Sequence, residues 1–229
     1  MIYVTGDTHG DIDAGKLSVR RFPEQKSLTR EDYLIILGDF GAVWHGGPKD
    51  NYLLKWHEQK PYTTLFIGGN HENYQALSAF PVEKWNGGRV RRVRPHVLQL
   101  LNGQVFTLEG RRFFVMGGAT STDKDSRREG VSWWPGEEPD DVDYAEAEQN
   151  LSALGYEVDI VLTHTIPKGA YTKILSGRPD TGSRVEAYLD GLAGKLAYRR
   201  WYAGHMHQDR VVEDMRLRLM YDDIEEITV

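Results

Sequence analysis

Residues 2–10 read Ile-Tyr-Val-Thr-Gly-Asp-Thr-His-Gly. A short β-favouring run leads directly into a glycine, an aspartate and, two positions later, a histidine. This pattern is typical of a buried strand that ends in a functional turn. The arrangement recurs after later apolar runs, at Gly38-Asp39, Gly69-Asn70-His71, His164 and Gly204-His205-Met206-His207. Because ligands bind at the carboxyl ends of strands in open α/β sheets, we predict that these side chains meet at one edge.

Apolar runs alternate with stretches of helical periodicity through most of the chain. The runs predicted as strands are Ile2–Thr5, Tyr33–Leu37, Thr64–Ile67, Arg112–Met116, Asp159–Thr163 and Trp201–Ala203, followed by Arg210–Glu213, Leu217–Tyr221 and Glu225–Val229. Helices are predicted over Asn51–Gln59, Asn73–Phe80, Asp143–Leu154 and Arg184–Leu192. This order predicts an α/β fold in which a pair of mixed sheets is flanked by helices, as a single domain over residues 1–229.

Composition excludes several classes of protein. The 229 residues include no cysteine, which rules out disulfides and thiolate metal sites, and their formal charge of −6 argues against a generic nucleic-acid coat. Apolar runs are too short to cross a bilayer, and no signal-peptide pattern follows Met1, so we expect a cytoplasmic protein without a membrane partner. The basic run Arg89–Arg94 is interpreted as a solvated strand or loop face.

The residue types at the strand ends suit divalent metal ions. Imidazole and carboxylate ligands favour manganese, iron, zinc or nickel. A carboxylate such as Asp39 can bridge two ions roughly 3.5–4 Å apart, the separation found in two-metal phosphoesterase sites. Two divalent ions outweigh the charge of Asp7 and Asp39, so the site would attract a phosphate despite the negative chain.

The five blocks together resemble the calcineurin-like metallophosphoesterase superfamily. The resemblance implies two packed mixed β-sheets flanked by helices, a four-layer α-β-β-α sandwich. It implies hydrolysis of a phosphate mono- or diester by a hydroxide activated between two divalent ions, with manganese expected first. It also implies a role for each site residue: Asp7, His9 and His207 on one ion, Asn70, His164 and His205 on the other, Asp39 bridging them, and His71 as the proton donor.

One departure from the superfamily pattern bears on the substrate. Protein serine/threonine phosphatases carry Asp-Arg-Gly just after the second block, and that arginine grips the phosphoryl group. Here Trp44 and His45 follow the block instead. We therefore favour a small-molecule or nucleotide-like ester over a phosphoprotein. A non-catalytic, metal-binding interaction scaffold is the alternative from another class. An extended nucleic acid is not favoured, although the Arg89–Arg94 run counts mildly for one.

The long segment 117–141 has weak periodicity, and such loops are usually functional or mobile. This segment is predicted to bind the phosphoryl group through Arg127 or Arg128 in place of the absent arginine, because arginine binds phosphate in a bidentate manner. Trp133 or Trp134 would stack on a ring of the substrate, or would pin the loop to the core.

Three histidines lie outside the five blocks. His45, His57 and His96 are interpreted as ordinary surface or core histidines, with His45 near enough to the second block to line the site. A zinc-protease motif at His71-Glu72 is excluded, because Gln75 stands where its second histidine is required.

Overall fold

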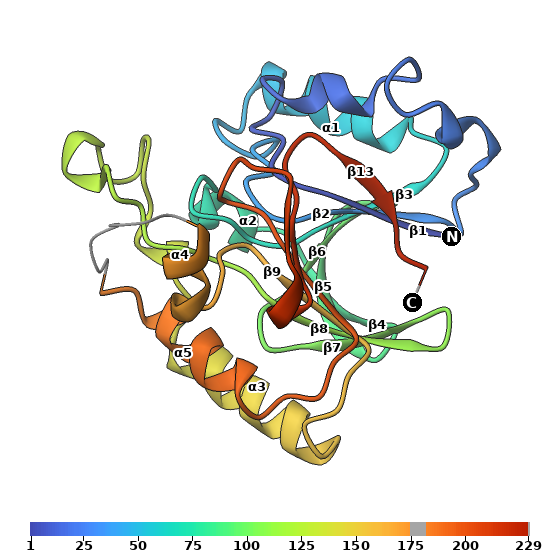
Figure 1. Cartoon of the computed structure of the whole chain (residues 1–229). Helices are drawn as coiled ribbons and strands as arrows, with labels where there is room; N and C mark the ends of the chain where they lie inside the picture. Colours follow the sequence, from blue (N-terminus) through green and yellow to red (C-terminus); the bar gives the residue numbers. More distant parts are fainter. Residues whose placement is uncertain (175–181, 229) are drawn as a thin grey trace.

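The computed structural model describes residues 1–174 and 182–228. Two mixed β-sheets pack face to face at its centre (Figure 1). The seven-stranded sheet has the order β13 (Ile224–Glu226), β1 (Ile2–Thr5), β2 (Tyr33–Ile36), β3 (Thr63–Phe66), β6 (Val97–Leu100), β5 (Gly88–Arg94) and β4 (Val82–Trp85). The six-stranded sheet has the order β11 (Arg210–Val212), β12 (Leu217–Leu219), β10 (Arg200–Ala203), β9 (Ile160–Thr163), β8 (Arg111–Met116) and β7 (Val105–Leu108).

Helices cover the outer face of each sheet, as Figure 1 shows. On the seven-stranded sheet lie α1 (Pro48–Glu58) and α2 (Tyr74–Ser78). On the six-stranded sheet lie α3 (Asp141–Ala153), α4 (Lys168–Ile174) and α5 (Arg184–Ala193). An apolar layer drawn from both sheets, including Leu65 and Phe113, fills the space between them. The predicted α-β-β-α sandwich is therefore confirmed. Among the described residues, no helix is long and apolar enough to cross a membrane.

Parallel pairing places the predicted strand ends together. In one sheet β1 pairs in parallel with β2, and β2 with β3. In the other sheet β9 lies between β8 and β10, parallel to both. The carboxyl ends of these strands carry the glycine-flanked aspartate, asparagine and histidine residues, so the sheet order brings distant parts of the sequence to one edge.

The helix boundaries follow local capping chemistry. Asp140 accepts hydrogen bonds from the backbone N–H groups of Val142 and Asp143, and Asp143 closes a capping box with Asp140. This capping begins α3 two residues before the predicted start. Gly155 follows the helix with φ of 63°, a left-handed conformation that favours glycine and ends the helix as predicted.

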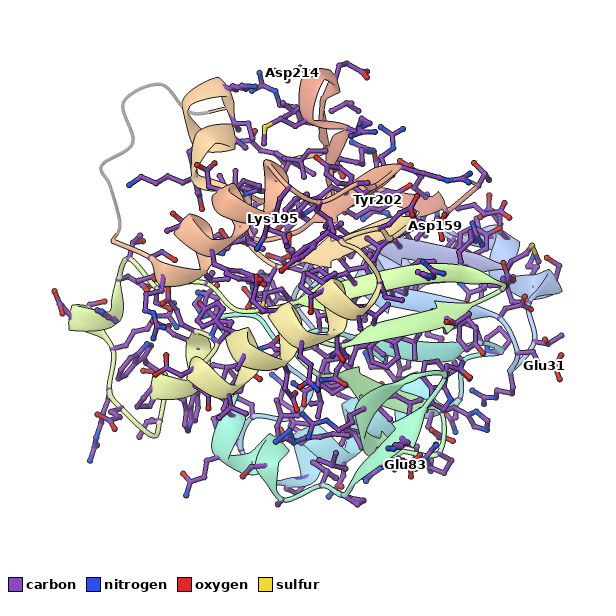
Figure 2. All side chains as sticks on the ribbon, turned by 90° about the horizontal axis from the view of Figure 1, so that it is seen from below. Glu31, Glu83, Asp159, Lys195, Tyr202 and Asp214 are labelled. Atoms are coloured by element: carbon purple, nitrogen blue, oxygen red, sulfur yellow. The ribbon has the colours of Figure 1, made fainter. Side chains whose placement is uncertain are left out.

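The predicted elements omit the segment that forms β4 to β7, and also α4. The basic run is part of β5, but its arginines are half-buried and not fully solvated. Arg89 pairs with Glu146, and Arg92 pairs with Glu83 on the edge strand β4. Glu83 is labelled in Figure 2. Because acidic partners already balance these two cations, the run offers less free positive charge to nucleic acid than its sequence indicates.

His57 is a core residue, as predicted, and it has an unusual environment. Its ring is fully buried between Phe40 and Trp56, with centroids 4.7 and 4.9 Å away, and neither ring nitrogen has a hydrogen-bond partner among the described residues. Burial, with a smaller effect from Lys60, lowers the pKa of His57 from 6.5 to about 3. The folded protein therefore holds this ring neutral.

This burial predicts a pH-dependent stability difference. The folded pKa lies below the unfolded value, so the contribution of neutral His57 is present above 6.5 and is lost as the pH falls toward 3. Between about pH 7.5 and pH 5, wild type should lose about 2 kcal/mol of unfolding free energy more than His57→Phe loses. Urea unfolding at both pH values measures the difference. Equal losses in the two proteins would contradict the prediction.

Candidate dinuclear metal centre

Four predicted ligands converge in one cluster. Single ligand atoms of Asp7, His9, Asp39 and His207 all lie within 4.8 Å of one another. Asp7 follows β1, Asp39 follows β2 and His207 follows β10, so the cluster spans both sheets. This is the set that the resemblance assigns to the first ion together with the bridging carboxylate. The sheet edge thus brings these four side chains together as the sequence predicts.

The two aspartates of this cluster carry buried oxygens that the protein leaves without a hydrogen bond. Asp7 and Asp39 are at most 1% exposed, and the Oδ2 atom of each has no hydrogen-bond partner among the described residues. The Nε2 atom of His207 lies 3.0 Å from Asp7 Oδ2, and the Nε2 atom of His9 lies 3.2 Å from Asp39 Oδ2. Buried carboxylates are normally paired or bound to metal, so this donor set fits a divalent cation.

The electrostatics of the cluster keep both carboxylates ionised. Burial alone would raise the pKa of Asp7, but the neighbouring His207 and His164 lower it. Burial would likewise raise the pKa of Asp39, and the imidazoles of His164, His9 and His71 lower it far below its ordinary value. Ionised oxygens are what a divalent cation requires of its ligands.

His9 is oriented by a residue that the sequence analysis missed. Its Nδ1 atom is hydrogen-bonded to Asp13 Oδ2 at 2.6 Å, which turns Nε2 toward Asp39. A carboxylate behind a metal-binding histidine fixes its ring and its tautomer. Burial lowers the pKa of His9, but Asp39, Asp7 and Asp13 raise it to about 9. Metal binding at His9 would therefore displace a proton.

A second group of acceptor atoms adjoins the first. His164 Nδ1 is 2.7 Å from the carbonyl oxygen of Leu37, which in the neutral ring makes Nε2 a lone-pair acceptor. That Nε2 lies 3.0 Å from Asn70 Oδ1 and 3.3 Å from Asp39 Oδ1. Asn70 itself is fixed by its Nδ2 atom, which donates to Ser121 Oγ at 3.0 Å. Three acceptors facing one another suit a cation shared with the first site through Asp39.

His205 joins this second group. Its backbone N–H donates to Asp7 Oδ1 at 3.0 Å, and its ring centroid lies 5.0 Å from that of His164. All seven predicted ligand positions therefore lie around one edge of the two sheets. Asp39 contacts both groups, through Oδ2 on one side and Oδ1 on the other.

The backbone of the ligand turns is unusual in a consistent way. Four ligands have left-handed φ angles: His9 at 43°, Asp39 at 47°, His205 at 62° and His207 at 49°. Non-glycine residues rarely adopt this conformation, and such strain concentrates at functional sites. Flanking glycines provide the space, because a Cβ atom at Gly38 would run into the His164 ring.

The predicted proton donor, His71, lies beside the cluster. Its ring centroid is 5.7 Å from that of His9, and its backbone N–H donates to Asp39 Oδ1 at 2.8 Å. The next residue, Glu72, is fully buried and accepts hydrogen bonds from the N–H groups of Phe40 and Gly41 at 2.6 and 3.3 Å. The segment Gly69–Glu72 thus contains a predicted ligand, the predicted proton donor and a carboxylate that supports the Asp39 turn.

A pocket of about 410 Å³ opens next to His9 and His71, within the size range of small-molecule sites. Its lining comes from the turn after β1, the segment after β2, helix α1 and the long loop: His9, Gly10, Asp11, Ile12, Gly41, Trp44, His45, Lys49, Asp50, Leu53, His71 and Arg127. His45 is one of these lining residues, which agrees with its position close to the second block in the sequence. The pocket adjoins the four-residue cluster through His9.

The two predicted arginines are placed differently. Arg127 lines the pocket, and its Nη2 atom lies 3.5 Å from His71 Nε2. Asp123 holds the guanidinium through Nε and Nη2, each at 2.8 Å. Arg128 is exposed and is not among the lining residues. Trp134 is buried with its ring against Trp44, which matches the alternative in which it pins the loop to the core.

Arg127→Ala is expected to lower kcat/KM about 10- to 100-fold, the effect of losing a hydrogen bond to a charged group. Arg127→Lys should recover little, because lysine lacks the fork that binds phosphate in a bidentate manner. Arg128→Ala is expected to change kcat/KM less than about twofold, as is usual for an exposed side chain. Steady-state kinetics on the preferred ester measure all three variants. Wild-type kcat/KM in both alanine variants would contradict the predicted role.

Lys16 is a further buried group near the site that the sequence analysis missed. It is 1% exposed, and its ammonium donates to the carbonyl oxygens of Gly6, Asp7 and Tyr221. It therefore fixes the turn after β1 from behind. Neither Lys16 nor Asp13 belongs to a recognisable motif, and only their proximity to the Asp7-x-His9 block in the sequence could have indicated them.

Comparison with known proteins agrees with this geometry. A family model described as calcineurin-like phosphoesterase matches residues 1–209. The chain belongs to this family, as the five blocks predict.

Curated relatives carry one name, lariat debranching enzyme. The protein from Danio rerio is 25% identical over 237 residues, which is 90% of this chain and 40% of that protein. The protein from Schizosaccharomyces pombe is 28% identical over 240 residues, which is 89% of this chain and 47% of that protein. The chain thus spans less than half the length of either relative. Among solved structures, phosphopantetheinyl hydrolase from Mycobacterium tuberculosis matches with a TM-score of 0.45 and 14% identity, covering 96% of this chain and 87% of that one.

Proposed function

We propose that this protein is a metal-dependent phosphoric ester hydrolase that acts on a small-molecule or nucleotide-like phosphate ester. One observation carries the proposal above the others. The two buried carboxylates Asp7 and Asp39 converge with two imidazoles, so that Asp7 Oδ2 and Asp39 Oδ2 lie 3.0 and 3.2 Å from the Nε2 atoms of His207 and His9, in a cluster whose ligand atoms all lie within 4.8 Å of one another. Membership of the calcineurin-like phosphoesterase family supports the same conclusion.

The proposed ligands divide between two ions. Asp7, His9 and His207 would hold one, Asn70, His164 and His205 would hold the other, and Asp39 would serve both. Two divalent ions in such a site lower the pKa of a bound water and neutralise phosphoryl oxygens. Manganese is the proposed metal, and iron, zinc and nickel suit the same nitrogen and oxygen ligands.

The chain itself supplies positioning and proton transfer. His71 is proposed to protonate the leaving oxygen, since its ring faces the pocket beside the cluster. Burial lowers the pKa of His71, and Arg127 adds to this effect although Asp39 opposes it. Arg127, held by Asp123, is proposed to bind a phosphoryl oxygen in place of the arginine that the second block lacks.

The proposal is tested with an aryl phosphate monoester and the matching diester, assayed side by side with Mn²⁺-loaded protein. Hydrolysis of either ester supports the proposal, and the preferred ester defines the substrate class. If neither ester is cleaved by protein with two ions bound, the non-catalytic scaffold is favoured instead.

The relatives favour a second candidate substrate, the branch linkage of a lariat. The acidic chain and the paired arginines of β5 count against a long nucleic acid, whereas the name shared by the relatives counts for a branched one. A branched oligonucleotide added to the same assay distinguishes the two. Cleavage at its branch, faster than cleavage of the aryl diester, would favour the second candidate.

A further inference from the structure

The 410 Å³ pocket has a lining suited to one kind of organic group. Trp44 provides an aromatic surface, and Leu53 and the 79%-exposed Ile12 add apolar contact. Gly10 and Gly41 also line the pocket, and their lack of side chains lets the two turns pack closely against each other. Small-molecule pockets are usually lined by aromatic and apolar side chains together with a few placed polar groups. A planar group that stacks on an indole and tolerates polar surroundings would be complementary to this lining.

The Trp44 side chain forms an aromatic wall of the pocket, and its position is fixed before any ligand binds. Asp50 Oδ2 accepts the backbone N–H groups of Trp44, His45 and Gly46 at 2.6, 2.8 and 2.8 Å. Asn73 Nδ2 donates to the carbonyl oxygen of Trp44 at 2.6 Å. The Trp134 ring meets the Trp44 ring edge-on, with centroids 4.8 Å apart and an interplanar angle of 83°. A fixed wall reduces the entropy that ligand binding costs.

Polar groups lie along the rest of the pocket. Lys49 Nζ pairs with Asp11 Oδ1 at 2.9 Å, and the exposed His45 lies beside Trp44 in the sequence. These groups can donate and accept hydrogen bonds with a sugar or with the edge of a base. The combination of an indole surface and a polar rim fits a nucleoside better than a lipid or a simple alkyl group.

The position of His71 decides which part of the substrate enters the pocket. His71 lines it together with Arg127, so the oxygen that His71 protonates belongs to the group held there. We infer that the pocket binds the leaving group, and that this leaving group is a nucleoside stacked on Trp44. The inference rests on the proposed function, because it takes His71 as the proton donor.

The reaction balances as an ordinary hydrolysis. Water adds to phosphorus, the bond between phosphorus and the nucleoside oxygen breaks, and His71 gives that oxygen its proton. The proton that the attacking water loses passes to solvent, and His71 regains a proton from solvent. The nucleoside then departs from the pocket as an alcohol, while the phosphate product stays on the metal side. The free nucleoside should therefore bind the same pocket and compete with substrate.

The test measures kcat/KM for an adenosine 5′-phosphate ester and for the matching glycerol phosphate ester, each of the preferred mono- or diester class. Trp44→Ala should lower the ratio of the two values roughly tenfold or more, as expected for the loss of a stacked base, and Trp44→Phe should restore most of it. A merely structural role of Trp44 would lower both values together. Tyr52→Ala is the matched control, because Tyr52 is 69% exposed on α1 and does not line the pocket.

Binding of adenosine to the Mn²⁺-loaded protein, followed by calorimetry, tests the pocket without turnover. We expect Trp44→Ala to weaken binding roughly tenfold or more and Tyr52→Ala to leave it at the wild-type value. An unchanged kcat/KM ratio in Trp44→Ala, or adenosine binding that Trp44→Ala does not weaken, would overturn the inference. If no ester reacts but adenosine still binds at Trp44, the proposed function is refuted. The pocket would then be a nucleoside-binding site without a role in hydrolysis.

Discussion

Asp39→Asn is expected to lower kcat/KM roughly 10³-fold or more, because loss of the shared ligand removes about 4 kcal/mol of charge stabilisation. Asp39 contacts both ligand groups, with Oδ2 near His9 and Oδ1 near His164. An amide in its place keeps one oxygen but loses the negative charge and the second oxygen. Phosphate-ester hydrolysis by Mn²⁺-loaded protein measures the effect.

The fold should survive this substitution. An asparagine oxygen can still accept the backbone N–H of His71, which donates to Asp39 Oδ1 in the wild-type protein. Asp214→Asn is a matched control, because Asp214 is 65% exposed and lies at the edge of the molecule (Figure 2). Asp39→Asn that retains wild-type kcat/KM would rule out Asp39 as the bridging ligand.

His71→Gln is expected to lower kcat roughly 10²- to 10⁴-fold on an alkyl phosphate ester, the usual contribution of a general acid. On a p-nitrophenyl ester the loss should be much smaller, because nitrophenolate leaves readily without a proton. Bound metal should stay at the wild-type level, since His71 lies beside the four-residue cluster and is not part of it. Kinetics on the two esters and a metal analysis measure these three quantities.

The decisive observation is the difference between the loss of kcat on the alkyl ester and the loss of kcat on the p-nitrophenyl ester. His96→Gln is the control for a generic histidine loss, because His96 is half-buried near Thr63 and is not among the residues that line the pocket. Equal losses of kcat on both esters would mean that His71 orients the site and does not donate the proton. Loss of bound metal would instead place His71 among the ligands.

The sequence predicts the central strands well, and it places the candidate ligands at strand ends where the structure also has them, because both features depend on local patterns. Ile2–Thr5 is predicted with its observed bounds, and Asp39 and His164 follow predicted strands as expected. A strand that is buried on both faces reads as a continuous apolar run. The glycine, aspartate and histidine residues that follow it are short-range signals, so no long-range contact is needed to find them.

Other elements escaped prediction because their signals are weak or long-range. Strands β4 and β5 alternate charged with apolar residues, and the ion pair between Arg92 and Glu83 that steadies them is not visible in periodicity. Asp13 and Glu72 are acidic residues of common type, and only the folded structure places them against His9 and the Asp39 turn. The wall at Trp44 depends on a carboxylate from α1, which no local pattern reveals.

In the loop 117–141, too, the sequence alone cannot decide which residue enters the pocket. The sequence names both Arg127 and Arg128 as candidates because their chemistry is the same. Only the contact of Arg127 with Asp123 turns one of them toward His71. Which of two adjacent cations enters a pocket depends on tertiary packing, so residue type alone cannot decide it.

The most direct test of the two-metal account is the rate of phosphate-ester hydrolysis measured against the number of Mn²⁺ ions bound per chain, starting from metal-free protein. The account predicts little activity up to one bound ion, a steep rise as the second binds, and a maximum at two ions per chain. Full activity with one ion bound, or no activity with two, would contradict it.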